Sequence, residues 1–284
     1  MQCALIAWFR YTNMRIPYFM MGWIVPFYML FGRKGYLSMY RFFRERLAYS
    51  PLKAFGYVYL NHYTFGQVIL DRFAAYAGKT FRFEINGSEH FEHLVNGQNG
   101  FIQLSSHVGN YELAGYSLVT RKKRFHALVF PGETETVMKN RNRLFALHNI
   151  GMVPVKADLS HVFLINNALS QGDIVSMPGD RIFGSRKSVR CPFFGADARF
   201  PLGPFAMAAR REVPALAVFV MKETISRYRI VVRPVEIPAS VAKSLSRKEK
   251  ETALARAFAG ELERVVSRYP TQWFNYYDFW NQEE

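Results

Sequence analysis

From residue 81 onward, short β-rich runs alternate with stretches of helical periodicity. The β-rich runs are 81–85, 101–105, 125–130, 152–155, 174–177, 215–221 and 228–232. Helical stretches lie between them, near residues 89–95, 110–120, 135–148, 159–170 and 205–211. Strands and helices that alternate in this way form a largely parallel sheet covered by helices. The sequence therefore predicts an α/β domain over residues 79–284, with a last amphipathic helix over about 246–268.

The first 78 residues have a different character. Aromatic and aliphatic residues recur every three or four positions over 36–49 and 53–77, and Ser50-Pro51 separates the two runs. This periodicity is typical of amphipathic helices. We therefore expect a helical N-terminal arm over residues 1–78.

Within this arm, residues 16–32 carry no charge. The segment is barely long enough to span a bilayer, and Pro17 and Pro26 interrupt it. Its Trp and Tyr residues are typical of the membrane interface. We expect membrane contact, more as a shallow or hairpin insertion than as a clean span; a buried core helix is the alternative. Basic residues are denser after the segment than before it, which favours a cytoplasmic location for the rest of the chain.

The charge balance favours anionic partners. There are 37 Lys and Arg against 22 Asp and Glu, which gives a net charge of +15. Nucleic acid, an anionic membrane and an acidic carrier protein all fit this balance. The chain lacks a Cys/His finger, a basic zipper and a basic tail, so we do not expect a nucleic-acid-binding module. Its two cysteines exclude a disulfide framework, and its histidines lack metal-ligand spacing.

One segment has the composition of a catalytic site. Residues 105–112 (SSHVGNYE) follow the apolar run 101–104 and open a helical stretch. His107 and Glu112 would lie about 140° apart on a continuous helix, so they can meet only if His107 lies in the turn before it. The intervening glycine permits that turn, and Asn110 suits the helix N-cap. Glu112 would then accept a ring N–H of His107 and leave the other ring nitrogen as a general base. A His107 that serves only as a turn residue is the alternative.

This segment resembles the H-x4-D/E motif of the lysophospholipid acyltransferase superfamily. The version H-V-G-N-Y-E looks like that of the bacterial lipid A biosynthesis (lauroyl/myristoyl) acyltransferases. Further ordered segments are similar to that branch: Ile85-Asn86-Gly87, Gly172-Asp173-Ile174, Gly179-Asp180-Arg181, Phe193-Phe194-Gly195, Phe200-Pro201-Leu202-Gly203-Pro204, Pro270-Thr271-Gln272-Trp273-Phe274-Asn275 and Asp278-Phe279-Trp280. The similarity extends over roughly residues 10–280.

The resemblance implies an α/β acyltransferase that works at the cytoplasmic face of the inner membrane, without a metal or prosthetic group. It implies transfer of a fatty acyl group from acyl carrier protein or acyl-CoA to a hydroxyl or amine of a membrane lipid. His107 would be the base and Glu112 its partner. Further residues would bind substrate: Asn110, Asp180, Arg181, Arg199, Phe200, Pro201 and Gly203.

The acceptor stays open between a lipid A-like lipid, an amino-lipid and others. Leu202 stands where glycerolipid acyltransferases carry a Glu that contacts the acceptor, which favours the first two. Arg181 stands where lipid A enzymes often carry Gln. A non-catalytic membrane or lipid-binding protein of the same fold is the alternative function.

Overall fold

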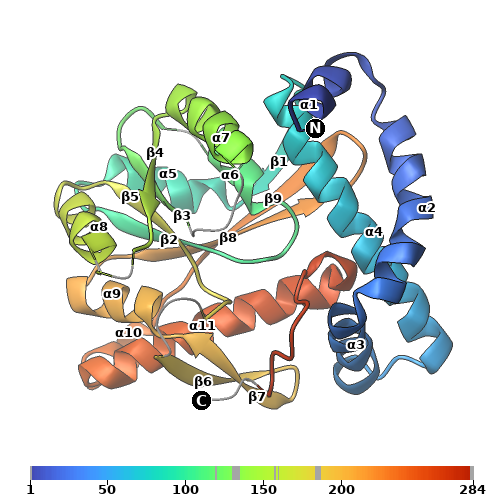
Figure 1. Cartoon of the computed structure of the whole chain (residues 1–284). Helices are drawn as coiled ribbons and strands as arrows, with labels where there is room; N and C mark the ends of the chain where they lie inside the picture. Colours follow the sequence, from blue (N-terminus) through green and yellow to red (C-terminus); the bar gives the residue numbers. More distant parts are fainter. Residues whose placement is uncertain are drawn as a thin grey trace.

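The central feature of the computed structural model is a seven-stranded sheet (Figure 1). The structure describes residues 2–118, 120–129, 135–156, 158, 160–182 and 187–281. The strand order is β1–β9–β8–β2–β5–β3–β4, and among the described strand pairs of this sheet only β8 and β9 run antiparallel. The strands are β1 (Arg82–Asn86), β2 (Phe101–Ser105), β3 (Phe125–Val129), β4 (Ile150–Pro154), β5 (Ile174–Pro178), β8 (Ala215–Lys222) and β9 (Arg227–Pro234). The predicted α/β fold with a largely parallel sheet is confirmed.

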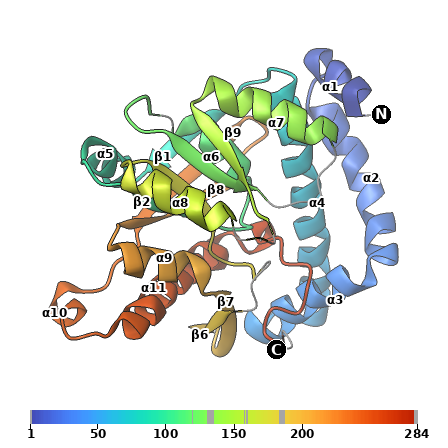
Figure 2. The same cartoon turned by 60° about the vertical axis from the view of Figure 1, so that its left-hand side comes forward.

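Helices cover both faces of this sheet (Figure 2). They are α5 (Ser88–Asn96), α6 (Tyr111–Ser117), α7 (Glu135–Leu147), α8 (Ser160–Ser170), α9 (Gly203–Arg211) and α11 (Arg247–Arg268), while the short helix α10 (Ala239–Ala242) buries no residue. Alternate residues of β2 point to opposite faces, as the pleat requires. Phe101 packs with side chains of α5, α6 and α7, whereas Ile102 and Leu104 pack with α8, α9 and α11. The ends of two predicted elements, at residues 130 and 159, lie outside the described residues.

The N-terminal arm lies along one side of the sheet, at the right in Figure 1. It consists of α1 (Gln2–Tyr11), α2 (Arg15–Phe31), α3 (Arg33–Arg41), the π-helical turn η1 (Phe42–Arg46) and α4 (Pro51–Tyr76). The predicted break at Ser50-Pro51 is present: the Ser50 hydroxyl accepts the Lys53 N–H, and Pro51 occupies the first helical position. Within the described ranges, no helix is both long enough and apolar enough to cross a bilayer.

Helix α2 continues through Pro26, so the expected interruption there is wrong. Proline has no N–H and leaves the carbonyl four residues earlier, that of Gly22, without its helical partner. The Tyr59 hydroxyl on α4 donates to this carbonyl at 3.0 Å. A side chain from the neighbouring helix thus replaces the missing backbone hydrogen bond and allows α2 to stay continuous.

A buried polar cluster joins the arm to the sheet. Asp71 on α4 accepts hydrogen bonds from the hydroxyls of Tyr18 on α2 and Tyr228 on β9, and pairs with the Lys222 ammonium on β8. All four residues are buried. Burial raises the pKa of Asp71 and lowers that of Lys222, while their mutual attraction opposes both shifts. Since a charge left without its partner in this interior is costly, the cluster fixes how α2 and α4 sit against β8 and β9.

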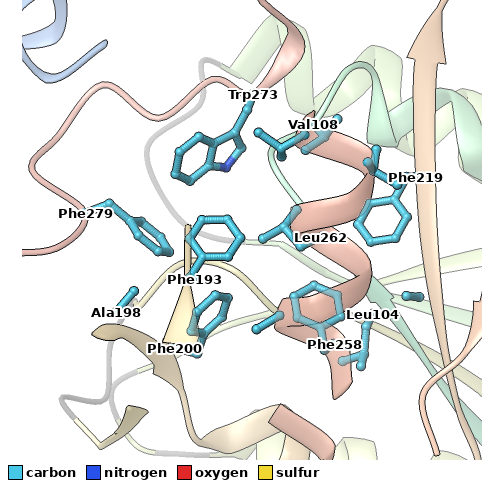
Figure 3. Close-up of a cluster of buried hydrophobic side chains, with 14 of the residues drawn as sticks. Leu104, Val108, Phe193, Ala198, Phe200, Phe219, Phe258, Leu262, Trp273 and Phe279 are labelled. Atoms are coloured by element: carbon cyan, nitrogen blue, oxygen red, sulfur yellow. The ribbon is translucent and has the colours of Figure 1, made fainter. Parts of the chain in front are cut away.

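A second sheet, the hairpin of β6 (Ser188–Phe193) and β7 (Ala196–Pro201), was not predicted. Figure 3 shows the cluster in which its Phe193 and Phe200 pack beside Trp273 and Phe279 of the C-terminal segment. All four are less than 2 % exposed. Helix α11 contributes Phe258 to the same cluster. The aromatic packing brings the C-terminal segment back to the end of β2, where the predicted site lies.

Candidate active site

His107 lies in the turn between β2 and α6, and Glu112 lies in the first turn of α6. This is the arrangement that the spacing predicts. Gly109 in the turn has φ of +60°, which favours glycine. A Cβ at this position would lie 1.9 Å from the carbonyl oxygen of Val220 on β8. The loop can therefore approach β8 this closely only without a side chain at residue 109.

Main-chain hydrogen bonds hold this loop from two sides. On one side, the Asn110 N–H donates to the Val220 carbonyl at 2.8 Å. On the other, the Gly109 N–H donates to the Gln272 carbonyl at 2.8 Å, and the Phe274 N–H donates to the His107 carbonyl at 2.9 Å. The loop is thus a short strand-like bridge between β8 and the C-terminal segment. This contact explains why two motifs so far apart in the sequence belong to one site.

The imidazole of His107 is oriented by Asp180, which follows β5. Its Nδ1 lies 2.8 Å from Oδ1 of Asp180, and the His107 backbone N–H donates to Oδ2 at 2.7 Å. Burial alone would raise the pKa of Asp180, but the His107 ring and the Arg181 guanidinium outweigh it and hold this pKa below its usual range. An ionised carboxylate only accepts hydrogen bonds, so Nδ1 carries a proton, and in the neutral ring the lone pair lies on Nε2.

Glu112 does not take this role, which corrects the expectation that it accepts the ring N–H. Its carboxylate accepts hydrogen bonds from the Tyr76 hydroxyl at 2.6 Å and from Arg141 at 2.9 and 3.2 Å, and Arg72 lies 3.4 Å away. No hydrogen bond joins Glu112 to His107 within the described part of the chain. Because the side chain leaves α6 toward α4 and α7, it meets their cations rather than the loop.

Two cavities meet at His107. The first, of about 260 Å³, lies between the sheet and helices α6 and α7. Polar groups line its end at His107 and its side along β2 and β5, and apolar side chains line the part beside β3, β4 and α7: Phe125, Ala127, Leu128, Val129, Phe145 and Ile150. A cavity with a polar end and a large apolar part suits a ligand with an alkyl chain and a polar head.

The second cavity, of about 450 Å³, lies beside α4 and the C-terminal segment. Phe65, Val68 and Ile69 line it from α4, and Phe274 from the opposite side. Four residues line both cavities: His107, Tyr111, Glu112 and Arg181. A group bound in one cavity can therefore reach a group bound in the other at the His107 ring.

Besides Asp180, two of the seven predicted substrate-binding residues lie with His107. Asn110 lines the second cavity, is buried, and directs its amide to the Val68 carbonyl at 3.4 Å. Arg181 donates to the Phe274 carbonyl at 3.2 Å and lies over the Tyr277 ring. Its Nε is buried without a partner among the described residues.

The other four predicted residues lie elsewhere. Phe200 belongs to the aromatic core, Pro201 ends β7, and Gly203 begins α9. Arg199 donates to the Ser188 hydroxyl across the hairpin at 2.9 Å. None of them lines either cavity at His107, so the expectation that this turn lines the cleft is corrected: the hairpin packs against the C-terminal segment instead.

Some residues of the site were not predicted. Asp180 was expected in the cleft but not as the partner of the His107 ring. Its position just after a strand could have indicated this role, because parallel strands end at the same edge of a sheet. Arg72, Tyr76 and Arg141 had no local signal, because only the fold brings α4 and α7 to Glu112. In the described ranges, His, Cys, Asp and Glu form no group that could hold a metal ion.

The close approach at Gly109 gives a direct test of the loop. Gly109→Ala should lower the melting temperature and abolish activity, because the added methyl group meets the Val220 carbonyl. The matched control is Gly195→Ala. Gly195 also has a positive φ, but no atom of another described residue, its two chain neighbours apart, lies within 4 Å of a Cβ added there. The control should show only the backbone cost of about 1 kcal/mol. Equal melting temperatures for the two variants would contradict the described loop geometry.

Comparison with known proteins agrees with this geometry. The sequence profile of the family described as bacterial lipid A biosynthesis acyltransferase matches residues 72–281, which include the whole sheet, both cavities' polar residues and the C-terminal segment. No curated protein matches the chain. Since the profile extends over most of the sequence, the chain belongs to the bacterial lipid A biosynthesis acyltransferase family and is an acyltransferase enzyme.

Proposed function

We propose that this enzyme transfers a fatty acyl group from an acyl-thioester to a hydroxyl or amine of a lipid A-like acceptor, with His107 as the general base. The observation that supports it is the position of His107. Its ring is fixed by Asp180 through Nδ1 and lines both cavities. A base must lie within hydrogen-bond reach of the proton that it removes, and the junction of two substrate cavities provides that place.

The reaction follows from this arrangement. Nε2 of His107 removes the proton of the acceptor hydroxyl or amine as the acceptor atom attacks the thioester carbonyl. The tetrahedral intermediate collapses, the carbon–sulfur bond breaks, and the imidazolium returns its proton to the leaving thiolate. Asp180 stabilises the imidazolium between these steps and keeps its ring in place. No atom of the enzyme becomes covalently attached to the acyl group.

Arg181 is the candidate to stabilise the oxyanion of the intermediate. It directly follows Asp180 and lines both cavities, and its buried Nε is a donor without a partner among the described residues. A fixed cation in a site with little water stabilises developing negative charge more than a solvated one does. The Phe274 carbonyl and the Tyr277 ring hold the guanidinium in place.

The two cavities suit the two substrates. The first has a large apolar part beside β3, β4 and α7 and would hold the acyl chain of the donor. The second lies along α4, the helix against which α2 packs, and would admit the lipid acceptor from the side of the arm. The net charge of +15 suits both an acidic acyl carrier protein and anionic lipid. The phosphates of acyl-CoA suit the same charge, so the donor stays open between acyl carrier protein and acyl-CoA.

We further propose that the arm attaches the enzyme to the cytoplasmic face of the inner membrane without crossing it. Helix α2 exposes an apolar face that the fold does not cover. Its members are between 52 and 86 % exposed: Ile16, Phe19, Met20, Trp23, Ile24, Phe27, Tyr28, Leu30 and Phe31. A contiguous apolar surface flanked by arginines is typical of a helix that lies in the membrane interface.

Amide substitutions of the two carboxylates separate their roles. His107→Ala should lower the rate by about 10²–10⁴-fold, which is the usual contribution of a general base. Asp180→Asn should lose a similar factor, because the amide no longer fixes the tautomer or offsets the imidazolium charge. Glu112→Gln should lose only about tenfold, since its amide oxygen still accepts from Tyr76 and Arg141. The measurement is an acyl-carrier-protein thioester assay, with circular dichroism as the folding control.

Near-normal turnover by folded His107→Ala would refute the mechanism and favour a lipid-binding protein of the same fold. A larger loss for Glu112→Gln than for Asp180→Asn would return the orienting role to Glu112.

The membrane proposal is tested with charged substitutions on the exposed face of α2. The double variant Trp23→Glu and Phe27→Glu should bind anionic vesicles at least about tenfold more weakly, because both rings are lost from the interface. Phe163→Glu on α8 is the matched control, since Phe163 is 75 % exposed but lies on the body. Binding is measured by co-sedimentation. The double variant and the wild type sedimenting alike would refute attachment through α2.

A further inference from the structure

The first cavity has one wall that does not suit a plain alkyl chain. Three polar side chains line it from the sheet: Gln103 and Ser105 on β2 and Ser176 on β5. Gln103 and Ser176 are register partners on adjacent parallel strands, so their side chains point to the same face. Aromatic and aliphatic groups of β3, β4 and α7 line the cavity beside them, and Glu112 and Arg141 line it from the helices. The part of the sheet formed by β2 and β5 is therefore polar toward the cavity, whereas the part formed by β3 and β4 is apolar.

Among these three residues, Gln103 is the one that indicates a polar group on the ligand. It is only 2 % exposed, and its Oε1 has no hydrogen-bond partner within the described structure. Its register neighbour on the other side, Leu216, is apolar and offers no side-chain partner. Buried amide groups in proteins almost always have a hydrogen-bond partner. A complex that leaves such a group without a partner is less stable. A saturated chain in this cavity would leave Oε1 unpaired and would also keep water from it.

We infer that the enzyme selects an acyl donor whose chain carries a hydroxyl group, and that Gln103 is the residue that recognises it. The inference rests on the proposed role of the first cavity as the acyl-chain site. A hydroxyl both donates and accepts, so it pairs with Oε1 and also with the neighbouring Ser176 hydroxyl. A site built around a hydroxyl discriminates against the analogue that lacks it, because the buried polar group is then left unpaired.

The depth of Gln103 places this hydroxyl away from the thioester. Gln103 lies two residues before Ser105, the last residue of β2, and thus about 7 Å further from the His107 end along the strand. The hydroxyl is therefore expected in the middle of the chain rather than on the carbon next to the carbonyl.

The test uses free fatty acids as probes of the cavity and needs no acceptor. Dodecanoic acid and a series of hydroxydodecanoic acids, with the hydroxyl at successive carbons, compete with a fluorescent fatty acid bound to the full-length enzyme. One mid-chain isomer should bind about tenfold more tightly than dodecanoic acid. In Gln103→Met, which keeps the length of the side chain but cannot bond, this preference should disappear. Gln103→Leu is the second variant, in case the first does not fold.

Gln98→Met is the control, because Gln98 is exposed on the loop before the same strand; it should keep the preference of the wild type. The inference would be overturned if the wild type bound all isomers equally, or if Gln103→Met kept the preference. Gln103 would then be hydrogen-bonded to bound water only. Failure of every fatty acid to displace the fluorescent probe would instead refute the acyl cavity of the proposed function.

Discussion

The backbone contacts of the His107 loop are the constraint on which the site depends. The loop is held by main-chain hydrogen bonds to Val220 on one side and to the segment of Gln272 and Phe274 on the other. Backbone bonds fix a loop more tightly than side-chain contacts do, since they leave no rotamers to order. With the loop held, Asp180 at the end of the neighbouring strand reaches both the backbone N–H and the ring of His107. The His107 ring is therefore held at one place, the junction of the two cavities.

The same constraint connects the N-terminal arm to the His107 loop. Gln272, whose carbonyl holds the loop, also pairs through its side chain with both backbone groups of Lys222. The Lys222 ammonium belongs to the buried cluster of Asp71, which includes Tyr18 of α2. A continuous set of buried hydrogen bonds thus runs from the arm to the turn at His107. These bonds fix α2, with its exposed apolar face, relative to the sheet and the His107 loop.

Much of this could be predicted from the sequence where the signal is local. Alternating β-rich and helical runs gave the fold, and the strand–turn–helix position of His107 gave the candidate base. The hairpin over 188–201 was missed because its strands are stabilised by aromatic packing from Trp273 and Phe279, far away in the sequence. The partner of His107 was misassigned for a similar reason: spacing suggested Glu112, but the sheet brings Asp180 to the ring. A one-dimensional pattern contains no information on which strand ends are adjacent.

Asp180, and not Glu112, is the residue that hydrogen-bonds the ring of His107 and thereby sets its tautomer. Nitrogen NMR of the histidine ring nitrogens, at a pH where the ring is neutral, distinguishes the two carboxylates. We expect a protonated Nδ1 and an unprotonated Nε2 in the wild type and in Glu112→Gln. In Asp180→Asn the amide would use its oxygen for the backbone N–H and present its NH₂ to Nδ1, which moves the ring proton to Nε2. A tautomer unchanged in Asp180→Asn, or one that switches in Glu112→Gln, would show that Asp180 does not set it.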